Sequence, residues 1–181
     1  MAKSRLFERT RSTRWIYKGR IVSLKEDTVR LPDGNTSKRE VVLHPGAVAV
    51  IAILPSDRIV LVRQFRKATE QELLEIPAGL AHKGESFPAA ARRELEEEAG
   101  YLAKNVKPVF TGFTSPGYSS EVIRFFLATG LKKTKAGGDR DEFIDVEVMP
   151  ISRAIKLASS GKIRDNKTMI GILLAEKWKN K

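Results

Sequence analysis

The sequence predicts an α+β fold, in which a mixed β-sheet flanked by helices follows an amino-terminal antiparallel β meander. Polar and apolar residues alternate in the amino-terminal third, which is typical of half-buried strands. Short apolar runs bounded by turn residues come next, and two segments with helical periodicity end the chain. With 181 residues and 41% hydrophobic composition, the chain can bury a real core.

The amino-terminal third is expected to form three strands. Residues 15–31 alternate well enough for two of them, and residues 38–44 read as the third. The intervening Pro32-Asp33-Gly34-Asn35 is a strong turn signal, because these four residue types favour turns. A β meander is therefore expected before residue 45.

Apolar runs and helical periodicity indicate the remaining elements. Ala47 to Leu54 and Arg58 to Phe65 flank Pro55-Ser56-Asp57 and are expected to pair as a hairpin. Later runs indicate strands at residues 109–113, 122–128 and 143–149. Helices are expected at residues 151–160 and 166–178. The second helix is expected to bury one apolar face, formed by Ile170, Leu173, Leu174 and Trp178.

The segment of residues 79–101, GLAHKGESFPAAARRELEEEAGY, predicts a capped helix at residues 87–99. Ser86 can cap the exposed amides, and Pro88 is tolerated in a first turn. Gly100 suits the left-handed conformation that ends many helices. At 100° per residue, a narrow apolar stripe forms on one side of this helix, made of Ala91, Leu95 and Ala99.

Glu94, Glu97 and Glu98 border this stripe on one side. Like charges three and four residues apart destabilise a bare helix by roughly 0.2–0.5 kcal/mol per pair, so the arrangement needs a compensating charge. Oxygen-only ligands favour a hard divalent ion, and we expect Mg²⁺, with Mn²⁺ as the alternative ion. The competing interpretation is a solvated helix face, which we adopt for Glu96 because it projects away from the other three.

The spacing of glycine, glutamate and arginine in this segment resembles the Nudix box. The box requires glycine, five residues, glutamate, seven residues, Arg-Glu-aliphatic, one residue, Glu-Glu, one residue and glycine. The sequence meets it at Gly79, Glu85, Arg93, Glu94, Leu95, Glu97, Glu98 and Gly100. The resemblance implies the α/β/α sandwich of the Nudix fold over residues 45–181, with residues 1–44 forming part of a homodimer interface.

Outside the box, the resemblance narrows to bacterial ADP-ribose pyrophosphatases. The stretches that carry it are Val62-Arg63-Gln64-Phe65-Arg66, Glu75-Ile76-Pro77-Ala78-Gly79, and Ser115-Pro116-Gly117 with Glu121. Pro116 lies sixteen residues beyond Gly100, an offset that marks ADP-ribose hydrolysis in the family. The resemblance implies Mg²⁺-dependent hydrolysis of the pyrophosphate bond of ADP-ribose, which yields AMP and ribose 5-phosphate.

The same resemblance assigns roles around the metal. Glu94 and Glu98 are expected to be ligands, joined by the main-chain carbonyl of Ala78. Glu97 is expected to ligate the ion or to bridge to it through water. Arg93 is expected to support catalysis by orienting the glutamates through ion pairs.

A general base is needed to accept a proton from the attacking water, and in this subgroup it comes from a mobile loop. The segment Gly137-Gly138-Asp139-Arg140-Asp141-Glu142 combines two glycines with acidic residues and precedes an expected strand. We assign the base to Glu142, with Asp141 next. The competing interpretation is an ordinary polar hairpin loop.

Substrate contacts are expected from several sides. Arg39 and Arg66 can pair with phosphate or stack on adenine, because guanidinium does both, and Glu121 can accept ribose hydroxyl hydrogen bonds. Pro116 is expected beside the substrate. Trp15 lies in strands that similar proteins exchange between subunits, so its ring is expected to stack on the base, unless it is simply a half-buried strand aromatic.

Composition argues against other classes of function. The net charge of +11 resides mainly in residues 1–20, with seven Lys and Arg against one Glu, and in residues 162–181, with six against two acids. This leaves +1 for the middle of the chain, so solvated termini explain the charge better than a specific nucleic-acid surface. The sequence contains no cysteine and no apolar run long enough to span a membrane. Both absences favour a cytoplasmic protein without membrane contact.

Two other functions stay open on the sequence alone. One is a broader pyrophosphatase for nucleoside diphosphate sugars such as ADP-glucose or GDP-mannose. The other is a non-catalytic nucleotide-sensing module, which would leave the full set of glutamates unexplained.

Overall fold

The computed structural model describes residues 4–134, 137 and 143–178. The chain forms two compact units. The first comprises Met1–Gly46 and Phe113–Val122, and the second comprises Ala47–Gly112 and Ile123–Lys181. Among the described helices, none is long and apolar enough to cross a membrane.

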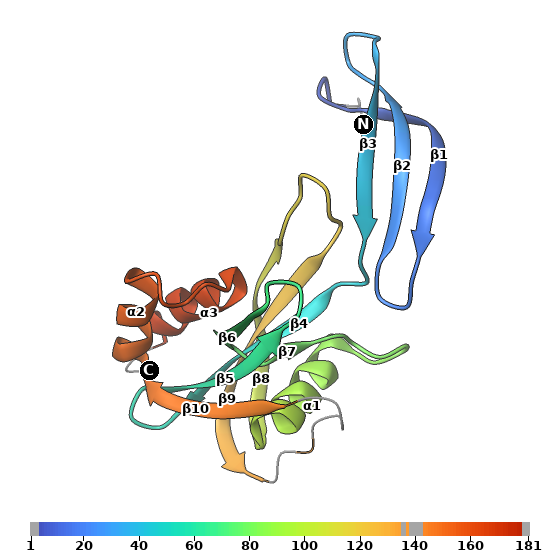
Figure 1. Ribbon diagram of the computed structural model, residues 1–181. Helices are drawn as coiled ribbons and strands as arrows, with labels where there is room; N and C mark the ends of the chain where they lie inside the picture. The colour runs from blue at the N-terminus through green and yellow to red at the C-terminus, as the bar shows by residue number, and fades with distance from the viewer. Residues whose placement is uncertain (1–3, 135–136, 138–142, 179–181) are drawn as a thin grey trace. The chain divides into compact units, whose positions relative to one another are not determined.

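The first unit contains a three-stranded antiparallel sheet in the order β1-β2-β3 (Figure 1). Its strands are β1 (Arg9–Lys18), β2 (Ser23–Arg30) and β3 (Thr36–Leu43). The meander predicted from the sequence is confirmed, although β1 begins six residues before the expected start at residue 15. Every residue of β1 is exposed, and its register with β2 shifts twice, so the strand carries no clean alternation to detect.

This sheet buries little apolar surface within its own unit. Val29 is buried, but several large apolar side chains stay exposed on the strands and their connections: Leu6, Phe7, Trp15, Ile16, Tyr17, Ile21 and Val22. The buried polar residue of the sheet is Asp27, which accepts hydrogen bonds from the Thr13 hydroxyl and the Lys25 amino group, both at 2.6 Å. Several large apolar side chains exposed on one small sheet are typical of an interaction surface.

The second unit is built on a mixed sheet in the order β10-β5-β4-β9-β8, with β6 paired to β5 and β7 paired to β4. β4 is parallel to β9 and antiparallel to β5, and β5 is antiparallel to β10. The strands are β4 (Ala47–Leu54), β5 (Arg58–Arg66), β6 (Gln71–Glu75), β7 (Ala78–Gly79), β8 (Tyr101–Phe113), β9 (Val122–Lys133) and β10 (Ile144–Pro150).

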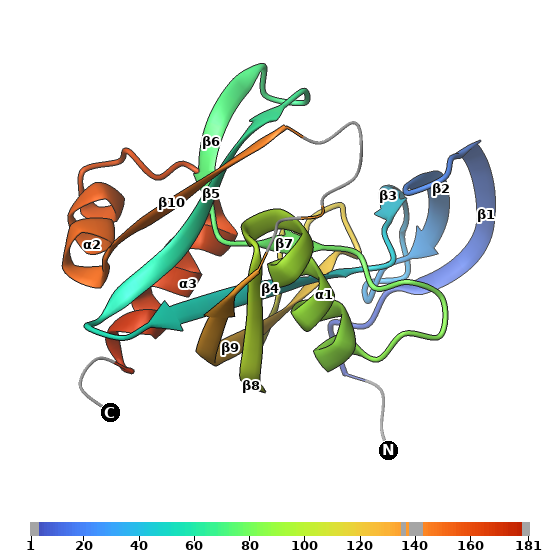
Figure 2. The same cartoon turned by 90° about the horizontal axis from the view of Figure 1, so that it is seen from below.

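Helices cover both faces of this sheet. α1 (Phe87–Ala99) packs on one face, while α2 (Ile151–Ser159) and α3 (Asn166–Glu176) pack on the other (Figures 1 and 2). β4 supplies both cores, because Ala49 and Ile51 point to α2 and α3 whereas Val48 and Val50 point to α1. The predicted mixed sheet between helices is therefore confirmed.

β8 is much longer than the five residues expected from the sequence. The expected strand began at residue 109, directly after Pro108. Most residues of β8 are exposed, so its amino-terminal part carries little apolar signal. β8 is the last strand in the order of the sheet, where a proline can be placed without losing a bond between paired strands.

The buried face of α3 differs from the expected one. Leu173, expected in the core, is 57% exposed, whereas Ile172 is fully buried. Gly171 faces the sheet closely, since a Cβ at this position would lie 2.8 Å from Ile76 Cδ1. The side of α3 that carries its glycine therefore faces the sheet, and Leu173 faces solvent. Ile170, Leu174 and Trp178 still pack partly against the core.

This orientation of α3 predicts unequal costs for two neighbouring truncations. We expect Ile172→Ala to lower the free energy of unfolding by about 3 kcal/mol, because it empties a filled core position. Leu173→Ala should cost less than about 1 kcal/mol, as exposed substitutions usually do. Urea denaturation of both variants measures the difference, and equal losses would show that the face of α3 is assigned wrongly.

Candidate active site

Local sequence signals fix α1 where it was predicted. The Ser86 hydroxyl accepts a hydrogen bond from the Ala89 N–H at 3.4 Å, and Pro88 lies in the first turn. Gly100 ends the helix with φ of 68°, a left-handed conformation that favours glycine, and its N–H donates to the Glu96 carbonyl at 2.9 Å. The expected apolar stripe is buried against the sheet, so the glutamates beside it are held at the sheet surface.

Two of these glutamates are buried and lie against β7. Glu94 is 8% exposed and Glu98 is 5% exposed, whereas Glu97 is half-buried. The Ala78 N–H donates to Glu98 Oε2 at 2.9 Å. A Cβ on Gly79 would lie 2.3 Å from Glu94 Oε1 and 2.4 Å from Oε2. Only glycine at position 79 therefore leaves room for the Glu94 carboxylate.

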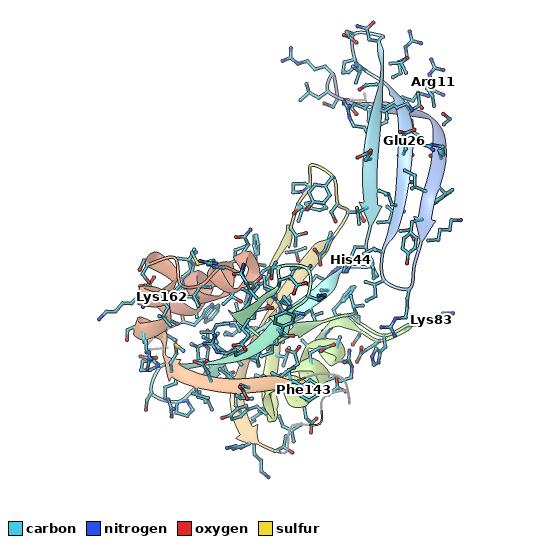
Figure 3. All side chains as sticks on the ribbon, viewed as in Figure 1. Arg11, Glu26, His44, Lys83, Phe143 and Lys162 are labelled. Carbon is cyan, nitrogen blue, oxygen red and sulfur yellow. The ribbon has the colours of Figure 1, made fainter. Side chains whose placement is uncertain are left out.

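Arg93 links the site glutamates to the loop that precedes α1. Its Nε and Nη2 donate to the two oxygens of Glu85, both at 3.1 Å, and Nη2 also donates to the Leu80 carbonyl at 2.8 Å. Its Nη1 donates to Glu94 at 2.8 Å and to Glu97 at 2.7 Å. All five N–H bonds of a guanidinium are thereby used. Figure 3 labels Lys83 in this loop.

The electrostatics of this cluster follow from its contacts. Burial alone would lower the pKa of the Arg93 guanidinium, but hydrogen bonds to Glu85 and Glu97 and the charge of Glu94 raise it overall. Hydrogen bonds from Arg93 and from the His82 backbone lower the pKa of Glu85. Over residues 4–134, 137 and 143–178, no three Asp, Glu or His side chains are already arranged to share one ion. Arg93 and the Ala78 N–H donate to carboxylate oxygens of the box glutamates.

A second charged cluster surrounds Glu75, at the end of β6. Its side chain is 1% exposed, and its two oxygens accept hydrogen bonds from Arg66 Nε at 2.8 Å and Nη2 at 2.7 Å. The Lys167 amino group, at the start of α3, also contacts Glu75. Burial would raise the pKa of the Glu75 carboxyl, but Arg66 and Lys167 outweigh it and the pKa is lowered. Arg66, expected to bind substrate, is thus tied to a buried carboxylate.

Two residues expected to bind substrate lie in the meander of the first unit. Arg39, on β3, donates from Nε and Nη2 to both oxygens of Glu8 at 2.9 and 2.6 Å. Trp15, on β1, is half exposed, and the Lys18 amino group lies 4.5 Å from the centroid of its ring. Their roles in substrate binding stay predictions.

Pro116 and Glu121 belong to the other segment of that unit. Pro116 is exposed in a turn closed by a bond from the Ser119 N–H to the Ser115 carbonyl at 2.9 Å. Glu121 accepts a bond from the Thr114 hydroxyl at 2.7 Å. Asp141 and Glu142, expected to supply the general base, lie outside the described residues.

Glu75 and Lys167 were not among the site residues expected from the sequence. Glu75 stood in a recognised stretch, but nothing in the local pattern marks it as buried. Lys167 is separated from Glu75 by 92 residues, and a lysine in the first turn of a helix carries no signal for such a contact. The one signal available in the sequence was an acidic residue at the start of the stretch Glu75-Ile76-Pro77-Ala78-Gly79.

Two family models match the chain. One, described as the NUDIX domain, matches residues 43–169. The other, described as the nucleoside diphosphate sugar hydrolase N-terminal domain, matches residues 8–42. Together they cover residues 8–169, which include the meander and most of the second unit.

Curated relatives resemble the chain over most of its length. A protein of Bacillus methanolicus named methanol dehydrogenase activator is 46% identical over 91% of this chain and 90% of its own. An ADP-ribose pyrophosphatase of Bacillus subtilis is 43% identical over 92% of this chain and 91% of its own. A solved structure titled as an ADP compounds hydrolase matches with a TM-score of 0.86 at 23% identity, covering 98% of this chain and 96% of that one. That likeness shows the fold alone.

The lowered pKa of Glu75 predicts how stability depends on pH. Because the folded-state pKa lies below the ordinary 4.5, the ionised carboxylate stabilises the fold above about pH 4.5 and the contribution is lost as pH falls through the folded pKa. At pH 7, Glu75→Gln should cost about 2 kcal/mol, less than the removal of a partner from a fully buried ion pair, because Arg66 reaches solvent.

Melting temperatures between pH 7 and pH 3 test this expectation. The gap between the wild type and Glu75→Gln should begin to narrow below about pH 4.5, where the carboxyl of the unfolded chain binds a proton, and should close once the folded carboxyl is protonated at lower pH. Glu72→Gln, an exposed change on the same strand, is the matched control and should follow the wild type. A gap that stays constant down to pH 3 would contradict the assignment of a stabilising charge to Glu75.

Proposed function

Since this chain belongs to the Nudix family, we propose that it hydrolyses the pyrophosphate bond of ADP-ribose and releases AMP and ribose 5-phosphate. The observation that carries the proposal is the burial of Glu94 and Glu98 against β7, where Gly79 makes room for a carboxylate. The 43% identity to a protein named ADP-ribose pyrophosphatase supports the choice of substrate.

The donor set of the site fits a divalent metal. Glu94, Glu97 and Glu98, with the main-chain carbonyl of Ala78, would hold Mg²⁺ or Mn²⁺. All of these donors are oxygens, which hard ions prefer, and the cradle at Gly79 would be closed by any larger residue. Such an ion, when bound, supplies charge neutralisation of the pyrophosphate and a lowered pKa for bound water.

The side chains of the protein would position the metal ligands and the substrate, and would accept a proton from the attacking water. Arg93 fixes the glutamates through Glu94 and Glu97 and ties them to the loop at Glu85. Arg66 presents its guanidinium to the phosphates, while Glu121 and Arg39 contribute to the nucleoside part. We retain Glu142 as the general base, with Asp141 next.

We also propose that the protein acts as a homodimer in which the meander of one subunit reaches the site of the other. The exposed apolar side chains of the first unit support this, because a three-stranded sheet gains stability when its apolar face is covered. Trp15 would then stack on the base in the partner's site. The charge of the termini gives no reason to add a specific nucleic-acid partner.

Sedimentation equilibrium tests the dimer. We expect twice the mass of the 20.2 kDa chain, and a shift toward monomer in Ile16→Glu, which places a charge among the exposed apolar residues. Arg11→Glu, also an exposed charge change on β1, should leave the dimer intact. A wild type that sediments as a monomer would remove this part of the proposal.

One alternative substrate range has support of its own. The family model that matches residues 8–42 is described by nucleoside diphosphate sugar hydrolysis, a broader class than ADP-ribose. A pyrophosphatase with that range would cleave ADP-glucose or GDP-mannose at rates similar to those for ADP-ribose.

Product analysis tests the substrate. ADP-ribose, ADP-glucose, GDP-mannose and NADH are incubated with the protein and Mg²⁺ in parallel, with a chelated control. Metal-dependent release of AMP from ADP-ribose at the highest kcat/KM is the expected outcome. Equal or faster turnover of another nucleotide sugar would replace the substrate, and binding without turnover would favour a sensing role.

A pair of isosteric substitutions on α1 tests the metal assignment. Glu98→Gln should lower kcat by more than about 100-fold, because even the outer-shell partners of metal ligands are worth roughly 10–100-fold. Its melting temperature should change little, since the amide oxygen can still accept from the Ala78 N–H. Glu96→Gln is the matched control on the same helix and should retain full turnover. If Glu98→Gln turned over at the wild-type rate, the metal would have to be assigned elsewhere.

A further inference from the structure

The first turn of α3 is bound to the connection between β6 and β7, which leads into the candidate site. The Asp165 carboxylate accepts from the Thr168 N–H at 2.9 Å and so caps α3. The Thr168 hydroxyl accepts from the Ile76 N–H at 2.8 Å, and Thr168 is fully buried. Two residues after Ile76, the Ala78 N–H donates to Glu98. The start of α3 therefore holds the backbone on which part of the site is built.

Lys167 adds charge to this connection. Its side chain is largely buried, and its amino group contacts both the Glu75 carboxylate and Asp165 Oδ2, the latter at 3.0 Å. Glu75 is shared, because its other contacts are the two hydrogen bonds from Arg66. Lys167 thus reaches Arg66 through one buried carboxylate, in a cluster that balances two cations with two anions.

Arg66 keeps donors available for a substrate. Its Nε and Nη2 are directed to Glu75, while Nη1 has no hydrogen-bond partner in the described part of the chain, and its side chain reaches solvent. Hydrogen bonds to Glu75 raise the pKa of Arg66 against the effect of burial, and the charges of Glu98 and Asp165 raise it further. The guanidinium is thus within electrostatic reach of a box glutamate.

We propose that Lys167 is a positioning residue for the hydrolase: by sharing Glu75, it holds the Arg66 guanidinium in place with its Nη1 directed to a phosphate oxygen of the substrate. The inference rests on the proposed function, since it needs an anionic substrate at the site. It assigns no contact between Lys167 and the substrate.

The physical reason lies in the charge balance. With Lys167 present, the two carboxylates of the cluster are matched, so Arg66 retains its attraction for phosphate. Without Lys167, Arg66 is the only cation of the cluster. It then balances only one of the two carboxylates, Glu75 and Asp165, and the cluster carries a net negative charge. Phosphate oxygens would then meet a less favourable field in a partly buried place, where charges interact more strongly than in water.

A double-mutant cycle on Lys167 and Arg66 tests the proposal. Lys167→Met should raise KM for ADP-ribose about tenfold while kcat changes less than about twofold, because binding is lost equally in the ground and transition states. Lys167→Arg should restore most of the wild-type KM. In an Arg66→Gln background, Lys167→Met should add less than about twofold, because coupled residues are not additive.

Lys162→Met is the matched control. Lys162 is an exposed lysine in the connection between α2 and α3 (Figure 3), and its removal should leave KM unchanged. Should Lys167→Met fail to fold, Lys167→Gln can be used in the same cycle, because its amide can still donate to Glu75 without the charge. Melting temperatures of all variants separate folding from binding.

Three results would overturn the proposal. They are an unchanged KM in the neutral variants, a tenfold effect that persists in the Arg66→Gln background, or a loss of melting temperature with KM and kcat of the folded protein intact. The last would make Lys167 structural only.

The substrate assignment is tested separately by the wild type. If the wild type prefers another nucleotide sugar, the cycle is run on that substrate and the same KM pattern supports the role of Lys167. If no substrate turns over, the proposed function fails. The Kd of ADP-ribose is then measured by calorimetry for each variant of the double-mutant cycle, in place of KM. Absence of both turnover and binding overturns the inference as well.

Discussion

The central constraint in this structure is the burial of the Glu94 and Glu98 carboxylates between α1 and β7. A buried carboxylate is costly unless hydrogen-bond donors or cations surround it. Gly79 allows the helix to approach, the Ala78 N–H donates to Glu98, and Arg93 compensates Glu94. The same features that make the burial tolerable also place several carboxylates along one side of a helix, where we propose that a divalent ion replaces part of the compensation.

The segment from Glu75 to Gly79, which joins β6 to β7, is held from both faces of the sheet. On one side, Glu98 of α1 accepts from Ala78, and on the other, Thr168 of α3 accepts from Ile76. Glu75 occupies the start of this segment with Arg66 and Lys167 as partners. Two helices that are distant in sequence thereby fix a few residues of backbone. Rigid support of this kind is what a site that orients a phosphate requires.

The meander, unlike the second unit, has little apolar core of its own. Its buried interior includes a carboxylate, Asp27, held by Thr13 and Lys25, while several of its aromatic and aliphatic side chains stay exposed. A sheet of three strands can bury little surface without another layer, so its stability is expected to depend on a covering surface. We therefore propose that a second subunit covers the sheet. Because every residue of β1 is exposed within one chain, the strand shows no clear alternation of polar and apolar residues.

By itself, the sequence determined what depends on neighbours along the chain. The bounds of α1 follow from Ser86, Pro88 and Gly100, and the face that carries Glu94 and Glu98 follows from helical spacing, because these effects act within about one or two turns. Only the tertiary structure decided the face of α3, the passage of β8 through Pro108, and the meeting of Glu75 with Lys167. Each of these depends on which surfaces pack together, and that choice is made by the shape of the whole core, at separations where spacing along the chain carries no information.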